Sequence, residues 1–349
     1  MTKFIRRLQK IGSSILVSLP IEWVEANKLE KSDEVEIETG TNSISLTPVD
    51  SSRPPKEVVI QYPVSKEENI SADVTGAYLL GYDIIKIKGK SAISIEDREK
   101  IRALMRRLVG MEIIDEDASN VTVQFLLDAT TLSPDKILKR MSSIALGLFR
   151  DTINSLTSED KTVLQTIPSR DDEIDRQYFL LVRLIRSAMV DNKLATALNL
   201  GNIDILDYRV AANLLETAGD AIVELASSIQ DLSMSKSDLK KLYNIAVEIE
   251  HIHEKAITSF IENNRLLAIE AIKLQRTYQK KISGILISNQ PKKEVSIQLL
   301  DLVYTLENLA KCWADVNTAQ IVFESTILPE RTIFSTFLKS ILTTDIISS

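Results

Sequence analysis

Residues 214–226, LLETAGDAIVELA, belong to an apolar pattern of helical period that runs from Ser133 almost to the end of the chain. Few glycines interrupt it. Short polar breaks divide it into six long helices, at TSED, TIPSR, NLGN, SMSKS and NQP. This part of the chain is therefore predicted to be all-α.

The six helices fall into two sets of three that overlay. A shift of 91 residues places Leu215 and Glu216 of the first third helix on Leu306 and Glu307 of the second. A shift of 104 aligns one apolar face of the first helices, with Met141, Ala145, Leu148, Ile153 and Leu156 on Ile245, Ile249, Ile252, Ile257 and Phe260. The pattern predicts tandem three-helix bundles at residues 133–231 and 235–325.

Residues 3–48 have the pattern of short strands around one helix. ILVSL and EVEIE alternate apolar and polar residues, Pro20 opens the helix IEWVEANKL, and ETGTNS is a hairpin turn. A segment this short makes a thin core, so we expect it to dimerise. DSSRPPKE then marks a linker.

Residues 57–128 alternate between the two kinds of element. EVVIQY, DIIKIKG, MEIID and VTVQFLL are strand-like, whereas SADVTGAYLLGY and SIEDREKIRALMRRLVG are helix-like. We predict a small α+β unit here.

Composition narrows the classes of function. The 349 residues are 44% hydrophobic with a net charge of −7, which favours several packed domains and makes any nucleic-acid contact local. Cys312, the one cysteine, and the lack of a leader or spanning segment favour the cytoplasm. Two histidines and no phosphate loop or nucleophile elbow leave nothing that argues for an enzyme.

Two acidic pairs are candidate metal ligands. Asp171 and Asp175 stand four apart in the second predicted helix of the first bundle, and Glu216 and Asp220 stand four apart in the third. If these helices are antiparallel neighbours, four carboxylates converge, and they repel unless they are protonated or bridged by a cation. The alternative is a solvated acidic face neutralised by arginines nearby in sequence, Arg170 and Arg176.

The second bundle differs at the matching positions, where Gln275, Gln279, Glu307 and Lys311 stand. Lys311 would occupy the place of a cation, and a contact with Glu307 four residues earlier can stabilise the helix without metal. We therefore expect iron, manganese or magnesium in the first bundle only.

Two further sets of side chains give weaker signals. His251 and His253 are two apart and so lie on nearly opposite helix faces, which disfavours joint chelation. An arginine stripe with a spacing of four residues is formed by Arg98, Arg102 and Arg106. It could bind an anion, or it could be a solvated helix face whose charge is balanced by the acidic residues that flank it.

A basic arm opens the chain, with cations at Lys3, Arg6, Arg7 and Lys10 and no acidic residue among the first twenty. A strand with one face in a barrel could present such cations outward, and two-fold dimerisation would double them into a strip matched to a duplex. The other interpretation is an edge strand protected by charge.

The sequence RRLQKIGSSILVSLPIEWVEANKLEKSDEVEIE resembles the SpoVT/AbrB-type domain. The resemblance implies a swapped-hairpin β-barrel dimer that binds DNA through basic residues near the first hairpin. The family often has arginine directly after the glycine, whereas Ser13 follows Gly12 here; Ser13 and Ser14 can donate to phosphates.

The helical part resembles PhoU, the phosphate-uptake regulator, over about residues 133–325. The resemblance implies paired three-helix bundles with E(D)xxxD metal motifs, which DDEID and ETAGD match in the first bundle. It also implies contact with a phosphate transporter or its signalling kinase.

These observations together predict three parts: a small swapped-hairpin β-barrel, a small α+β middle unit, and all-α tandem three-helix bundles. The leading hypothesis is a non-enzymatic, cytoplasmic, phosphate-responsive regulator that binds double-stranded DNA as a homodimer. The alternative is an adaptor that does not bind DNA and regulates a phosphate transporter or sensor kinase by protein contact.

Overall fold

The computed structural model describes residues 3–39, 43–49, 55–63, 69–230, 232, 234–288 and 297–317. The chain divides into two compact units, residues 1–55 (the first unit) and 56–349 (the second unit). Several predicted features lie outside the described residues: the tip of the ETGTNS turn, most of the DSSRPPKE linker, the NQP break, and the end of the second bundle at residue 325.

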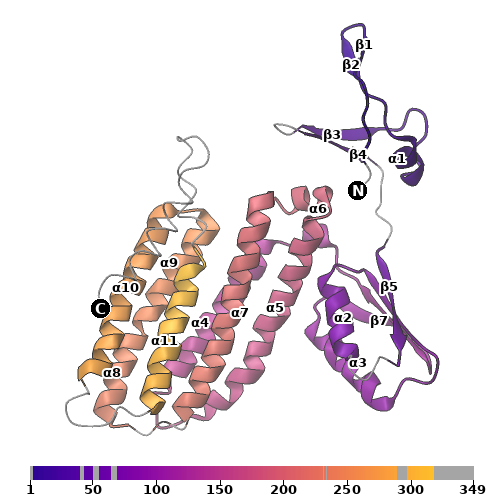
Figure 1. Cartoon of the computed structure of the whole chain (residues 1–349). Helices are drawn as coiled ribbons and strands as arrows, with labels where there is room; N and C mark the ends of the chain where they lie inside the picture. The colour runs from indigo at the N-terminus through magenta and orange to yellow at the C-terminus, as the bar shows by residue number, and fades with distance from the viewer. Residues whose placement is uncertain are drawn as a thin grey trace. The chain divides into compact units, whose positions relative to one another are not determined.

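The first unit consists of two hairpins around one short helix (Figure 1). Strands β1 (Gln9–Ile11) and β2 (Ser14–Leu16) are antiparallel, as are β3 (Val35–Thr39) and β4 (Ile44–Pro48), and α1 (Ile21–Ala26) lies between the pairs in sequence. Gly12 has a φ of 63°, which favours glycine and lets the first hairpin turn within two residues. This strand-rich fold agrees with the prediction; the closed barrel stays a prediction.

The hairpins expose their apolar side chains. Ile11, Ile15, Ile37 and Ile44 are 58–67% exposed, and Pro48 is the one buried side chain among the described residues of this unit. One copy of the first unit therefore has almost no core of its own, as the thin-core argument predicts.

The second unit begins with the α+β domain, whose four strands are ordered β5-β6-β8-β7. The first two strands are parallel, and β8 is antiparallel to both of its neighbours. Every predicted segment forms the predicted kind of element: β5 (Glu57–Tyr62), α2 (Ile70–Leu79), β6 (Ile84–Gly89), α3 (Ile95–Arg107), β7 (Met111–Glu116) and β8 (Asn120–Phe125).

Local chemistry explains these boundaries. The Asn69 side chain caps α2 by accepting from Ser71 N at 2.9 Å, and the Ser94 hydroxyl caps α3 by accepting from Asp97 N at 3.1 Å. Alternate strand residues are buried on one face of the sheet, namely Ile85, Ile87, Val121 and Val123. Helices α2 and α3 pack against strands of the sheet and against α5, so the α+β domain is seated on the first bundle.

The first bundle consists of α4 (Pro134–Asn154), α5 (Ile167–Ala188) and α7 (Asn202–Gln230), which pack on one another. A short helix that the sequence did not predict, α6 (Asn192–Ala197), lies between the last two. The second bundle consists of α8 (Lys236–Ala246), α9 (Glu248–Glu262), α10 (Arg265–Ser288) and α11 (Ile297–Asp315). Figure 1 shows the long helices of both bundles side by side.

The predicted first helix of the second bundle is divided at Val247 into α8 and α9, and the burial register shifts there. Ile249, Ile252 and Phe260 are buried as the overlay predicts. Ile245 and Ile257 are only half-buried, and the adjoining Ala246 and Ala256 are buried instead. Three of the five overlaid positions in the first helix of the second bundle are therefore buried as predicted, and at the other two the adjoining residue is buried instead.

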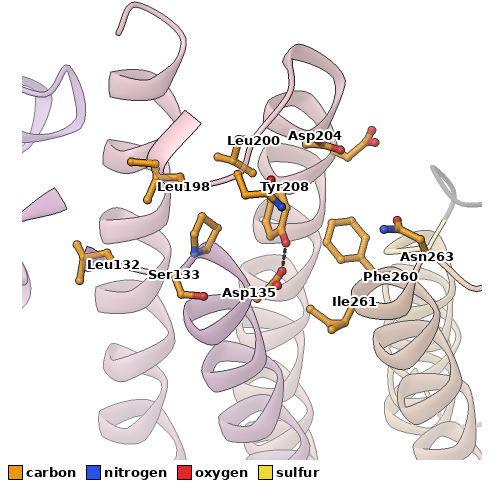
Figure 2. Close-up of a pocket in the computed structure, with 14 residues that line it drawn as sticks. Leu132, Ser133, Asp135, Leu198, Leu200, Asp204, Tyr208, Phe260, Ile261 and Asn263 are labelled. Carbon is orange, nitrogen blue, oxygen red and sulfur yellow. Dashed lines mark hydrogen bonds between the residues drawn. The ribbon is translucent and has the colours of Figure 1, made fainter. Parts of the chain in front are cut away.

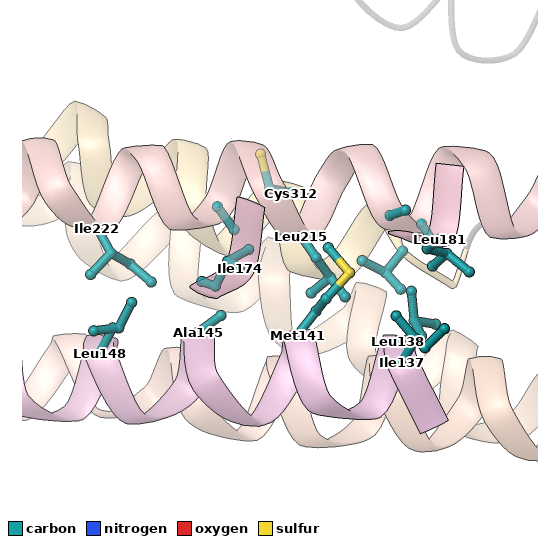
Figure 3. Packing of buried hydrophobic residues seen from close by; sticks show 14 of the residues in the cluster. Ile137, Leu138, Met141, Ala145, Leu148, Ile174, Leu181, Leu215, Ile222 and Cys312 are labelled. Carbon is teal, nitrogen blue, oxygen red and sulfur yellow. The ribbon is translucent and has the colours of Figure 1, made fainter. Parts of the chain in front are cut away.

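The two bundles share one apolar core, because α7 packs on α11 and α4 packs on α9. Figure 3 shows side chains of this core, including Met141, Leu148 and Leu215, all fully buried. Phe149 of α4 meets Trp313 of α11 edge to face at 5.1 Å. Among the described residues, no helix is both long and apolar enough to span a bilayer.

Candidate functional sites

The basic arm is fully displayed to solvent. Lys3, Arg6, Arg7, Lys10, Ser13 and Ser14 are all exposed. The Arg6 guanidinium lies 5.4 Å from the Phe4 ring, and its Nη1 donates to Ile5 O at 3.2 Å. Within the described residues, none of these four cations forms an ion pair with a carboxylate, so their charge is available to a partner.

The arm differs from prediction in its secondary structure. We expected Arg6, Arg7 and Lys10 to lie in one strand that presents some of the cations outward, but β1 begins only at Gln9 and includes Lys10 alone. Residues 3–8 have no regular structure, and the pairing of β1 with β2 ends at Gln9, opposite Leu16. An irregular basic segment can still follow a phosphate backbone, since phosphate contacts need charge rather than a fixed register.

The carboxylate cluster, formed by Asp171, Asp175, Glu216 and Asp220, lies between α5 and α7, which pack together. Asp171 is buried at 9% exposure, and its Oδ1 lies so close to the α7 backbone that a Cβ at Gly219 would overlap it. Glycine at 219 therefore allows the Asp171 carboxylate to reach α7 from α5.

The carboxylates act on one another electrostatically. Burial raises the pKa of Asp171 to about 7, and the charges of Asp175, Asp220 and Glu216 add to the rise. Burial followed by Asp220 and Asp175 also raises the pKa of Glu216. The neighbouring carboxylates thus make ionisation of Asp171 and Glu216 less favourable, and a cation at the cluster would reverse this effect.

A cation from the α+β domain already reaches the cluster. Arg107, at the end of α3, donates from Nη2 to Asp175 Oδ2 at 2.7 Å and lies 3.7 Å from Asp172. Burial raises the pKa of Asp175, and the Arg107 guanidinium opposes that rise. The arginines expected to neutralise this face are engaged elsewhere: Arg170 pairs with Asp151 and Arg176 with Glu173.

The chemistry of the donor set fits a hard divalent cation, because the four side chains offer only carboxylate oxygens. In the part of the chain that the structure describes, however, no three His, Cys, Asp or Glu side chains surround one point closely enough to hold an ion. Metal binding would therefore require the carboxylates to draw together, and it stays a prediction.

The matching positions of the second bundle lack such a cluster. Glu307 accepts a hydrogen bond from the Ser283 hydroxyl at 3.0 Å. The expected Lys311–Glu307 contact is not formed among the described residues; the Lys311 charge instead acts on Asp315, whose pKa burial raises and Lys311 opposes. The Ser283 hydroxyl, which the sequence overlay did not consider, takes the place of the lysine.

A buried arginine joins the α+β domain to the first bundle, and sequence reasoning missed it. Arg183 of α5 donates from Nη1 to the carbonyls of Tyr78 at 2.9 Å and Tyr82 at 2.8 Å, and from Nη2 to Asp83 at 3.2 Å. Its guanidinium also lies 4.0 Å from the Phe125 ring. The sequence did contain a signal for this buried arginine, because Arg183 interrupts the apolar run FLLVRLI.

The two histidines have separate surroundings, as their spacing predicts. His253 is buried, its Nε2 lies 2.9 Å from the Ser142 hydroxyl, and its ring meets Trp313 edge to face at 4.5 Å. Burial lowers the pKa of His253 to about 4, so the ring is neutral near pH 7. His251 is exposed beside Glu254. These contacts make His253 part of the core between the bundles.

A pocket of about 660 Å³ lies at one end of the bundles, between the start of α4, the α6–α7 connection and the end of α9. Figure 2 shows the Tyr208 hydroxyl donating to Asp135 across it, with Phe260 nearby. Asp204, on its rim, accepts from Gly201 N at 2.8 Å at the start of α7. Tyr208, Asp135 and Asp204 thus have local structural partners.

Comparison with known proteins identifies two domains. Residues 138–229 match the family model of the PhoU domain. The chain contains a PhoU domain. Residues 8–54 match the family model described as antidote-toxin recognition MazE, bacterial antitoxin. The two predicted resemblances are thereby confirmed, with a MazE/AbrB-type domain preceding the PhoU domain; the PhoU match covers residues 138–229 of the predicted range 133–325.

A solved structure, the phosphate transport system regulatory protein PhoU from Streptococcus pneumoniae, is 15% identical, with a TM-score of 0.42. The match covers 57% of this chain and 96% of that one. The comparison with curated proteins gives no match. The PhoU domain thus coincides with the first bundle, which contains the carboxylate cluster, and both matched domain types are regulatory rather than enzymatic.

Proposed function

We propose that this protein is a phosphate-responsive transcription regulator that binds double-stranded DNA as a homodimer through its first unit. The observation that supports this most directly is the exposed basic arm, which has no carboxylate partners in the described residues and belongs to a domain of MazE/AbrB type. The net charge of the whole chain is −7, so attraction to a duplex would have to come from this local concentration of cations.

Dimerisation is part of the proposal because the first unit exposes the side chains that should form its core. Burying the four isoleucines of its hairpins against a second copy would stabilise the dimer by about 1.5–3 kcal/mol for each side chain fully removed from water. The same pairing would place two arms on one two-fold axis, which suits a duplex. A DNA-binding regulator works where the DNA is, so we place the protein in the cytoplasm.

The PhoU domain supports the phosphate response and a role for a metal ion. Asp171, Asp175, Glu216 and Asp220 would hold iron, manganese or magnesium, whose charge would neutralise the repelling carboxylates. The second bundle offers one carboxylate, two amides and a lysine at the matching positions, so we propose metal in the first bundle only.

Duplex binding by the full chain, with and without phosphate, tests this function. Fluorescence anisotropy with a labelled duplex from DNA that co-purifies with the protein should show binding at low salt, and about 10 mM inorganic phosphate at fixed ionic strength should change the affinity. A shuffled duplex is the control for sequence preference. Binding that phosphate leaves unchanged would refute direct phosphate response, and no binding at low salt would refute the DNA-binding function.

The second candidate is an adaptor that acts by protein contact, on a phosphate transporter subunit or a sensor kinase. A row of apolar side chains on α7 favours it: Ile203, Leu206 and Val210 lie on one helical face and are exposed. An adaptor would need this row and would not need the arm. Leu206→Glu should abolish its function and leave duplex binding intact, whereas a DNA-binding regulator should lose function when the arm is neutralised.

A further inference from the structure

The arginine stripe of α3 does not form one uniform face. Arg98 turns toward the β7–β8 connection, where Nη2 donates to the carbonyls of Asp117 at 2.5 Å and Ala118 at 2.6 Å, and Nη1 contacts Glu116. Arg102 and Arg106, one and two turns further on, instead line a cleft against α5. The first arginine is thus structural, and the other two need a separate explanation.

This arginine cleft has a volume of about 580 Å³, which is within the usual range of small-molecule sites. It lies between the last turns of α3, the start of β7 and α5, and a third guanidinium, from Arg176 of α5, also lines it. Its apolar lining includes Leu108, which is fully buried. Three arginines from two elements therefore line one cleft beside an apolar wall.

Two of these arginines, Arg106 and Arg176, have N–H donors without an acceptor in the described residues. Arg106 has no ion pair or hydrogen bond among the described residues. Arg176 donates from Nη1 to Glu173 at 2.8 Å, while its Nε is shielded from solvent and has no acceptor. A guanidinium has five N–H donors, and a buried donor without an acceptor is unfavourable. An anion in the cleft would supply acceptors for the unpaired N–H groups of Arg106, and it would reach Arg176 Nε only after a shift of that side chain.

The charge of the cleft favours an anion over a neutral ligand. Glu112 is the one carboxylate among the lining residues, but Glu99 and Glu116 offset the charge of Arg102 and Glu173 offsets that of Arg176, so Arg106 supplies the charge without a partner in the described residues. Arg102 Nη1 is held by Glu99 at 2.7 Å, but its Nη2 is only loosely engaged, 3.3–3.4 Å from Glu116. The C-terminus of α3 adds about half a negative charge nearby, which the unpaired charge of Arg106 outweighs. Tetrahedral phosphoryl oxygens suit such bidentate donors.

We propose that the arginine cleft binds a phosphoryl group, either inorganic phosphate or the phosphate of a small monoester, through Arg106 and Arg176 with support from Arg102. This deepens and rests on the proposed phosphate response, because it assigns the effector site to the junction of the α+β domain and the PhoU domain. The bound anion joins α3 to α5, the helix that also holds Asp171 and Asp175.

Isothermal titration calorimetry of the full chain at constant ionic strength tests the site, with inorganic phosphate and a nucleoside monophosphate as separate ligands and sulfate as the comparison anion. Arg106→Gln and Arg176→Gln should each weaken phosphate binding about tenfold, the effect of losing one charge-assisted hydrogen bond. Arg276→Gln, which removes an exposed arginine of α10 outside the cleft, should leave binding unchanged. Circular dichroism of each variant checks folding.

The outcomes separate this site from the proposed function. Phosphate binding that neither cleft variant weakens would overturn the site and leave the phosphate response standing. Sulfate bound as tightly as either phosphate ligand would show an unspecific anion patch and also overturn it. Binding of the monoester alone, abolished in both variants, would support the site with an ester as its ligand. If no phosphate compound binds although the chain binds DNA, the site and the direct phosphate response both fail.

Discussion

Arg107→Gln tests whether the α+β domain neutralises the carboxylate cluster. The substitution removes the guanidinium that donates to Asp175 at 2.7 Å and approaches Asp172 at 3.7 Å. The Arg107 side chain is 48% exposed, so the ion pair itself should contribute no more than about 0.2–1 kcal/mol to stability. The cluster should respond more strongly than the fold, because the pKa of Asp175 should rise further without its cation.

The same change should strengthen divalent metal binding. A divalent ion on the order of 6 Å from a guanidinium is repelled by about 1.4 kcal/mol even at the dielectric constant of bulk water. Removing Arg107 should therefore raise the affinity for Mn²⁺ about tenfold, together with a small loss of thermal stability in the absence of metal. Calorimetric titration of the full chain with Mn²⁺, under reducing conditions and after chelator treatment, measures both binding constants.

Lys100→Gln is the matched control, because it removes one cation from the same helix whose partners, Glu96 and Asp97, lie on α3 itself. It should leave Mn²⁺ affinity unchanged. Equal Mn²⁺ binding by the wild-type chain and Arg107→Gln would refute the electrostatic role of Arg107 and leave the metal site intact. No Mn²⁺ binding by either chain would refute the metal site itself.

Three further predictions concern buried groups and the bundles. Because burial holds the pKa of His253 at about 4 against 6.5 when unfolded, the contribution of His253 to stability should fall by up to about 3 kcal/mol as pH falls from 6.5 to 4, whereas the raised pKa of Asp171 acts in the opposite direction; circular dichroism melts should therefore show the wild type losing stability relative to His253→Gln over this range, with His251→Gln following the wild type. Arg183→Met removes the donors to Tyr82 O and Asp83, while Tyr78 O keeps its bond from Gly81 N, and should cost about 1–3 kcal/mol in urea unfolding; an unchanged midpoint would contradict this. Mn²⁺ should raise the melting temperature of the wild type and of Glu307→Gln but not of Asp220→Asn, and equal shifts in all three would place the metal elsewhere.

The elements that follow a clear periodicity could be predicted from sequence. All six elements of residues 57–128 occur where their patterns place them, because alternation in the strands and caps such as Asn69 and Ser94 are local signals. The helix α6 was missed because six residues are too few to show a helical period. The division at Val247 was missed because the apolar pattern continues across it.

The candidate sites were predictable only as far as their residues are close in sequence. Spacing four apart placed each acidic pair on one helical face, and packing of α5 on α7 brings the pairs near one another. The partners of these sites come from far away: Arg107 is 68 residues from Asp175, and Arg183 is 105 residues from Tyr78. No local pattern encodes such pairings, which the packing of the α+β domain on the bundle determines.

The central claim is that the basic arm binds duplex DNA, and the salt dependence of binding tests it most directly. Binding constants of the full chain for a labelled duplex are measured from about 50 to 200 mM salt, where each neutralised phosphate adds close to one unit to the slope of log K against log salt. The test variant replaces three cations of the arm by alanine: Arg6, Arg7 and Lys10. The control variant replaces three exposed cations of the second unit by alanine: Lys240, Arg276 and Lys280.

We expect the arm variant to bind more weakly at low salt, with a slope reduced by about one unit for every phosphate that the arm no longer neutralises, while the control variant keeps the wild-type slope. Size-exclusion chromatography should show both variants in the oligomeric state of the wild type, since the exposed apolar faces of the hairpins are unchanged. An arm variant with wild-type affinity and slope would contradict the claim and favour the adaptor.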